Sequence, residues 1–101
     1  MNKALVALLF GGLLVQTTAM ASTGEELFKA KACVACHAVN KTVVGPAFRE
    51  VAAKYGADGV VHISNSIKTG SKGVWGPIPM PGNAVSPDEA KVLAEWIVTL
   101  K

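Results

Sequence analysis

The sequence predicts an all-α fold. Apolar residues recur at intervals of three and four in several segments, which is the spacing of one helix face. Glycine and proline separate these segments, and no stretch alternates between apolar and polar residues as a half-buried strand does. These observations predict a small domain of a few helices joined by Gly/Pro loops.

Residues 1–21 have the features of a secretory signal peptide that is cleaved from the chain. Met1-Asn2-Lys3 is a short positive segment, residues 4–15 are mostly apolar, and Ala19-Met20-Ala21 is a small-x-small cleavage signal. A membrane anchor is the alternative, but a spanning helix needs about 20 apolar residues. We therefore expect one domain over residues 22–101, located in the periplasm and not inserted in the membrane after cleavage.

The first helix is expected over residues 24–32. Ser22 or Thr23 can serve as its N-cap, and Glu25 and Glu26 suit the positive end of the helix dipole. The helix leads directly into the only two cysteines of the chain.

Two further helices are expected between the cysteines and a glycine-rich segment. The first of them begins at Pro46, which is tolerated at the first helical position, and ends before Gly56. The next is capped by Asp58 and runs to Thr69. Their predicted apolar positions are Phe48, Val51, Ala52, Tyr55, Val60, Ile63 and Ile67.

Residues 70–85 contain many glycines and prolines, and we expect them to form a long irregular loop. A loop of this length in so small a domain usually has a function. The last helix then begins at Pro87, with Ser86 as N-cap and Glu89 completing a capping box. Its predicted apolar face consists of Ala90, Leu93, Trp96, Ile97 and Leu100.

Cys33, Cys36 and His37 form a C-x-x-C-H motif, the attachment signal of a c-type haem. Each thiol can add across one haem vinyl group, and the adjacent imidazole can reach the iron. A disulfide or a thioredoxin-like dithiol is the alternative. No βαβ pattern surrounds the cysteines, however, and this alternative leaves His37 without a role. We therefore expect one covalent haem c with His37 as an axial iron ligand.

Met80 is the candidate for the second axial ligand, because it is the only methionine of residues 22–101 and lies between two prolines. A thioether opposite an imidazole is the ligation of electron-carrying cytochromes c. His62 is the rival ligand.

An iron with both axial positions filled has no position for oxygen or peroxide, which favours an electron carrier over an enzyme. A haem peroxidase or gas sensor would require Met80 to dissociate, and a haem domain docked permanently in a larger complex is a further alternative.

Three other residues are candidates for supporting the haem and its ligands. The carbonyl of Pro46 is expected to accept a hydrogen bond from His37, because a metal-bound imidazole needs an acceptor for its second nitrogen. Trp75 is either a core residue or a donor to a haem propionate. Asn83 either donates to the Met80 sulfur or braces the loop.

The charge of the chain excludes nucleic acid as an expected partner. The formal net charge is +3, and it becomes +2 when Lys3 leaves with the signal peptide. The lysines form no basic tract, and no recognition motif appears. Some lysines either steer acidic protein partners or are simply solvated; these are Lys29, Lys31, Lys41 and Lys72.

Residues 26–101 resemble the short monohaem class I cytochromes c of bacteria, the cytochrome c-551/c-552 (cytochrome c8) type. The motif Cys33–His37 alone marks only c-type haem, whereas its combination with a tryptophan and an I-P-M-P loop is far more specific. The resemblance is carried by Leu27-Phe28, Cys33 to Ala38, Val44-Gly45-Pro46-Ala47, Val51 to Tyr55, Gly73 to Pro81, and Leu93 to Ile97.

The resemblance implies a class I cytochrome c fold of about four helices around one covalent haem. It implies a monomeric periplasmic electron carrier of a respiratory chain, with His37 and Met80 as axial ligands. In this family the proline matching Pro46 accepts a hydrogen bond from the histidine, and the tryptophan matching Trp75 bonds a haem propionate. The asparagine matching Asn83 lies near the methionine sulfur. Its partners include nitrite reductase of the cytochrome cd1 kind, terminal oxidases and quinol-oxidising complexes.

The chain departs from the family pattern at two positions. Gly82 stands where a second proline is common, and Ser66 stands near the place of an arginine that often reaches a propionate. The reduction potential and propionate pKa of the family are therefore not expected to carry over.

Overall fold

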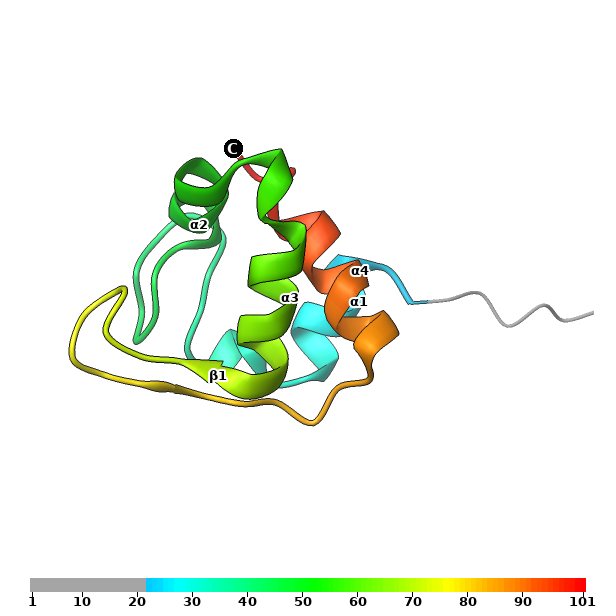
Figure 1. Ribbon diagram of the computed structural model, residues 1–101, viewed down its shortest axis with the longest axis horizontal. Coiled ribbons are helices and arrows are strands. Elements are labelled where there is room, and N and C mark those ends of the chain that lie inside the picture. Colours follow the sequence, from blue (N-terminus) through cyan, green and yellow to red (C-terminus); the bar gives the residue numbers. More distant parts are fainter. Residues whose placement is uncertain (1–21) are drawn as a thin grey trace, which may run out of the picture.

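The computed structural model describes residues 22–101, and the predicted signal peptide lies outside this range. Within it the fold is helical, which confirms the all-α prediction, and two long loops extend from the helices on one side of the domain (Figure 1). The elements in chain order are α1 (Gly24–Ala30), the 3-10 turn η1 (Cys33–Ala35), α2 (Phe48–Tyr55), η2 (Ala57–Gly59), α3 (Val60–Thr69), β1 (Gly70–Ser71), β2 (Met80–Pro81) and α4 (Pro87–Ile97).

Helices α1 and α4 begin with the same local structure. The side chain of Thr23 accepts from the backbone N–H of Glu26, and the Glu26 carboxylate accepts from the backbone N–H of Thr23. Ser86 and Glu89 form the same reciprocal pair at α4, as the sequence predicted. Each capping box satisfies two backbone donors that a helix start otherwise leaves free.

The core lies where α1, α3 and α4 meet. Phe28 packs on Phe48 and Trp96, with ring centroids 5.2 and 5.5 Å apart. A Cβ atom on Gly24 would collide with the Trp96 side chain, so the absence of a side chain allows α1 to approach α4 closely. The buried apolar residues of this cluster are Leu27, Phe28, Phe48, Val51, Ile63, Ile67, Ala90, Leu93, Ala94 and Ile97.

Two predicted helix starts are wrong. Helix α2 begins at Phe48 with Ala47 as N-cap, so Pro46 precedes the helix and its carbonyl is free to accept from another element. Helix α3 begins at Val60, and Asp58 lies in η2 without capping it by its side chain. The chain is extended at Ala47 before α2 and forms a 3-10 turn before α3, and the helical spacing reveals neither.

The first helix is also shorter than predicted. It ends at Ala30, and Ala32 adopts a left-handed conformation with φ of 65°. This residue turns the chain sharply before the cysteines, so the 3-10 turn at Cys33–Ala35 starts in a new direction.

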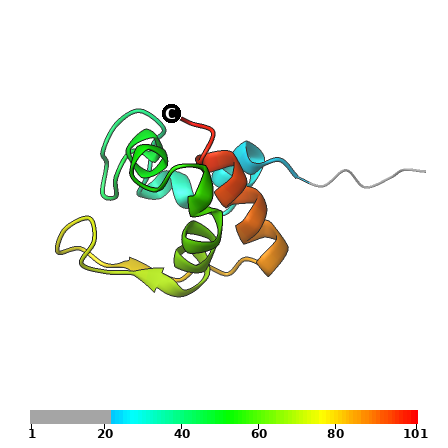
Figure 2. The same ribbon diagram turned by 45° about the horizontal axis from the view of Figure 1, so that its top comes forward.

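The prediction that residues 70–85 lack regular structure is wrong at two places. Gly70 pairs with Pro81 and Ser71 with Met80 in a short antiparallel ladder. This ladder closes the base of the loop, which then extends away from the helices (Figure 2). The position of Met80 is therefore tied to the end of α3.

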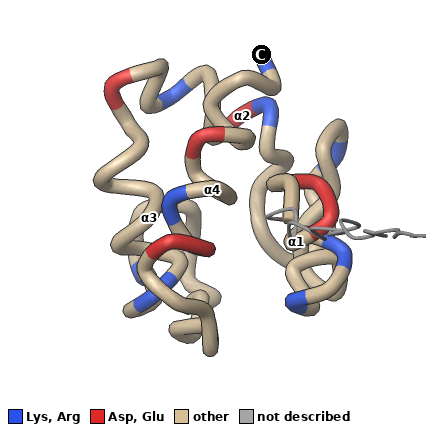
Figure 3. Tube along the Cα trace, turned by 90° about the vertical axis from the view of Figure 1, so that its right-hand side faces the viewer, with Lys and Arg blue, Asp and Glu red and all other residues tan. Residues whose placement is uncertain are grey.

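Charged residues of both signs are distributed over the helices rather than gathered in one tract (Figure 3). Among residues 22–101, the helices are too short or too polar for any of them to traverse a lipid bilayer.

The capping box of α4 predicts a pH-dependent contribution to stability. The pKa of Glu89 is lowered, first because the backbone N–H of Ser86 donates to its carboxylate and further because Lys31 lies nearby. A carboxylate with a lowered pKa stabilises the fold above its unfolded pKa of about 4.3, and this contribution is lost as pH falls through the folded pKa.

We therefore expect Glu89→Gln to lower the free energy of unfolding at pH 7, and the difference from wild type to shrink as pH approaches 3. Urea unfolding of the haem-loaded protein at both pH values measures the effect. Asp88→Asn is the matched control, because Asp88 is in the same helical turn and makes no capping hydrogen bond. An equal loss at both pH values would contradict the expectation.

Candidate functional site

A cavity opens between α2, α3 and the two loops, and all the predicted ligand residues border it. The side facing the loop tip is lined by residues that include Cys36, His37, Val44, Pro46, Tyr55, His62, Ile63, Trp75 and Met80. An adjoining hollow reaches toward the core and is lined by Cys33, Cys36, His37, Ile67, Met80, Asn83 and Leu93, among others. His37 and Met80 line both parts, so each of the two residues borders the cavity as well as the hollow behind it.

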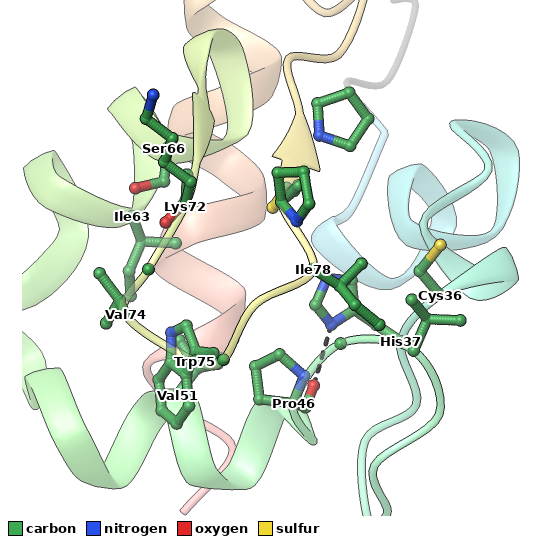
Figure 4. A pocket seen from close by; sticks show the side chains of 18 of the residues that line it. Cys36, His37, Pro46, Val51, Ile63, Ser66, Lys72, Val74, Trp75 and Ile78 are labelled. Carbon is green, nitrogen blue, oxygen red and sulfur yellow. Dashed lines mark hydrogen bonds between the residues drawn. The ribbon is translucent and has the colours of Figure 1, made fainter.

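The orientation of His37 is fixed by two local structures. The η1 turn presents the residue, with the His37 backbone N–H donating to the Cys33 carbonyl at 2.9 Å. The ring nitrogen Nδ1 lies 2.9 Å from the Pro46 carbonyl oxygen (Figure 4). Because a carbonyl only accepts, this bond assigns the ring hydrogen to Nδ1 and leaves the Nε2 lone pair free to bind a metal.

The loop that supplies Pro46 packs tightly against the imidazole. Backbone N–H groups of Val44 and Gly45 both donate to the Cys36 carbonyl, at 3.1 and 2.7 Å. A Cβ atom on Gly45 would collide with the His37 ring. The ring of Phe48 lies on another side of the imidazole, with centroids 4.8 Å apart. His37 is therefore held by contacts from several directions.

The two cysteines are free thiols in different environments. Cys33 is half-buried against the core, and this burial raises the pKa of its thiol. Cys36 is exposed and lies beside His37 at the mouth of the cavity (Figure 4). The 3-10 turn thus places both cysteines in the lining of the inner hollow.

Met80 lies in β2, half-buried and bordering the cavity. Asn83 lines the same inner hollow as Met80. Its side-chain amide donates to the carbonyls of Ile67, at 3.0 Å, and Pro81, at 3.5 Å. Asn83 therefore braces the loop against α3, and within residues 22–101 no hydrogen bond to the Met80 sulfur is present.

Trp75 is 40% exposed and is not a core residue. It lines the cavity from the loop between β1 and β2 (Figure 4). The rival ligand His62 is exposed on α3, where its ring stacks on Tyr55 with centroids 4.4 Å apart. Ser66, one turn further along α3, is half-buried and also borders the cavity.

Sequence reasoning missed the contacts of Lys54 and Tyr55 with Trp75. The Lys54 ammonium lies 5.6 Å from the Trp75 ring centroid, and the Tyr55 and Trp75 rings meet edge to face at 6.4 Å. Both α2 residues resemble ordinary helix positions, and only the folded loop brings Trp75 to them.

The residues fit a covalently attached c-type haem. Two free thiols border the cavity beside an imidazole whose Nε2 is unblocked, and a thioether borders the same space from the opposite loop. The remaining lining is largely apolar, as a porphyrin ring requires. Imidazole and thioether are the axial donors of electron-carrying haems.

The close approach of Gly45 generates a prediction about the imidazole. In Gly45→Ala the added methyl must displace the His37 ring or the loop, which weakens the hydrogen bond to Pro46. We expect the ferric electron paramagnetic resonance spectrum to show altered g-values and the free energy of unfolding to fall by about 1–3 kcal/mol. Val43→Ala, in the same loop but 47% exposed, is the control. Wild-type spectra and stability in Gly45→Ala would contradict the expectation.

Comparison with known proteins identifies the family. The family model described as "Cytochrome c" matches residues 21–101. Cytochrome c-551 of Pseudomonas denitrificans is 83% identical over 82 residues, which is 79% of this chain and 100% of that protein. Cytochrome c-551 of Pseudomonas aeruginosa is 52% identical over 100 residues, covering 97% of this chain and 96% of that protein.

The fold agrees with solved structures. The crystal structure of wild-type cytochrome c552 from Nitrosomonas europaea superimposes with a TM-score of 0.73 at 51% identity, and covers 76% of this chain and 99% of that chain. Class 1 cytochrome MtoD from Sideroxydans lithotrophicus has a TM-score of 0.64 at 28% identity, with 76% of this chain covered and 91% of that chain. The fold is therefore the class I cytochrome c fold.

One covalently attached haem c fits the two cysteines of this chain, and the relatives are electron carriers rather than enzymes. The chain belongs to the cytochrome c family and is a monohaem electron-transfer protein.

Proposed function

We propose that this cytochrome shuttles single electrons between redox proteins in the periplasm, with His37 and Met80 as the axial ligands of its haem iron. The hydrogen bond from His37 Nδ1 to the Pro46 carbonyl carries the proposal, because it leaves Nε2 as the nitrogen available to iron. Met80 is the sulfur donor that borders the same cavity.

The haem supplies an iron that alternates between the ferric and ferrous states. The chain supplies two neutral ligands, His37 and Met80, that suit both states, so neither state requires a ligand to be gained or lost. The soft thioether favours ferrous iron and raises the reduction potential. Because His37 and Met80 would both bind the iron, no position would remain for dioxygen or peroxide, which supports a carrier function.

Three further residues have proposed supporting roles. The Pro46 carbonyl keeps the His37 ring in one tautomer and one orientation. Trp75 borders the cavity, and its indole N–H is a suitable donor to a haem propionate. Asn83 holds the Met80 loop to the end of α3 through the Ile67 carbonyl.

The proposed partners are nitrite reductase, a terminal oxidase or a quinol-oxidising complex, met by a monomer of this protein. Exposed apolar side chains lie beside the cysteines and in the two loops, and they suit a brief contact with another protein; these are Val34, Val43, Val44, Val74 and Ile78. Ala35, next to Val34, is also exposed. Electrons would leave along this edge, where Cys36 is exposed.

The periplasmic location rests on the signal-like residues 1–21. The domain boundary near Ala21 is supported by the cytochrome c family model, which matches residues 21–101. We expect the protein purified from a periplasmic extract to begin at Ser22 and to carry the mass of residues 22–101 plus one haem. Intact-mass and N-terminal analysis measure this. Pigmented protein that retains residues 1–21 in the membrane fraction would contradict it.

The ligation is tested by the visible spectrum of the purified protein. We expect a far-red methionine–iron charge-transfer band in the ferric wild type, loss of this band in Met80→Ala, and tight carbon monoxide binding only by ferrous Met80→Ala. His62→Ala is the control and retains the band. A wild type without the band, or a band lost in His62→Ala, would contradict Met80 ligation.

A further inference from the structure

The loop that carries Met80 makes few polar contacts with the rest of the fold. Its base is closed by the pairing of β1 with β2 and by the Asn83 amide. Within the described chain, no hydrogen bond or ion pair involves residues 72–79. The loop tip therefore depends on contacts between side chains.

Trp75 makes ring contacts that join this tip to α2. Its ring meets Tyr55 edge to face, with centroids 6.4 Å apart and an interplanar angle of 73°. The Lys54 ammonium lies 5.6 Å from the Trp75 centroid and 5.7 Å from the Tyr55 centroid. A cation above two aromatic faces is attracted to both. We call Lys54, Tyr55 and Trp75 the aromatic latch.

Tyr55 is itself fixed by the element that follows it. His62 of α3 stacks against its ring at 4.4 Å, with an interplanar angle of 36°. The backbone at Gly59 comes so close that an added Cβ would lie 2.5 Å from the Tyr55 Cβ atom. Tyr55, the last residue of α2, is therefore half-buried and held against α3, and the Trp75 ring of the loop contacts it.

We propose that Lys54 and Tyr55 are positioning residues for the Met80 loop. By holding Trp75 against the end of α2, they limit how often residues 72–80 swing away from the cavity. They thereby set the rate at which an external ligand displaces the Met80 sulfur from iron. This inference rests on the proposed Met80 ligation, although the latch itself is a property of the chain.

The size of the expected effect follows from the contacts. An aromatic pair contributes about 0.5–1.5 kcal/mol beyond its buried area, and a cation–π contact at an exposed site about 0.5–1 kcal/mol. A ligand that enters only when the loop is open binds at a rate proportional to the open fraction. Loss of the Lys54 contacts should raise this rate about threefold, and loss of the Tyr55 ring about tenfold.

The test uses the ferric haem-loaded protein with imidazole as the displacing ligand. Stopped-flow loss of the methionine–iron band gives the displacement rate. We expect Lys54→Gln to raise the rate about threefold and Tyr55→Leu about tenfold, whereas Tyr55→Phe, which keeps the ring, behaves as wild type. Arg49→Gln is the matched control, because it removes an exposed positive charge from α2 without touching the latch.

A second measurement makes the inference independent of the ligand assignment. Hydrogen–deuterium exchange is read at the hydrogen-bonded amides of the loop base, in the β1–β2 ladder and at Asn83, whose N–H donates to the Ile67 carbonyl. It should be faster in Tyr55→Leu than in Tyr55→Phe, while exchange in α1 and α4 stays at the wild-type rate. Unchanged loop exchange, or equal displacement rates in Lys54→Gln and Arg49→Gln, would overturn the latch. A wild type without the methionine–iron band but with faster loop exchange in Tyr55→Leu would refute Met80 ligation and leave the latch standing.

Discussion

The hydrogen bond between His37 and Pro46 constrains the arrangement of the whole site. It requires the loop before α2 to run alongside the imidazole, and that approach is possible only because Gly45 has no side chain. The same bond explains why α2 begins late: Pro46 supplies an acceptor to the histidine instead of a first helical turn. One hydrogen bond thus determines the path of the loop at Pro46, the tautomer of His37 and the ring nitrogen that is free to bind a metal.

Local signals in the sequence predicted the helices well where the first turn is stabilised by its own residues. Ser86 and Glu89 cap α4 as expected, because a capping box needs only residues three apart. The predictions failed where the element is very short. Asp58 lies in a 3-10 turn that leads into α3, and Gly70–Ser71 pairs with a strand ten residues away. Neither the short turn nor the two-residue ladder has a periodicity that a sequence pattern can display.

The residues of the site also differ in how far the sequence alone indicates their roles. Cys33, Cys36 and His37 are adjacent in the chain, so their spacing alone indicates a haem. By contrast, the sequence left open whether Asn83 contacts sulfur or braces the loop, and the fold shows the amide on the Ile67 carbonyl. The contact of Trp75 with α2 was not foreseen, because it joins residues about twenty positions apart through ring geometry.

The absence of a side chain at Gly24 has a consequence for how the first and last helices are held together. Because the Gly24 backbone approaches the Trp96 side chain, the first turn of α1 lies against the last turns of α4. The Trp96 ring also packs on Phe28, so the same indole contacts α1 at two successive turns. Even alanine at position 24 would therefore push the two helices apart and shift the aromatic cluster on which the core is built.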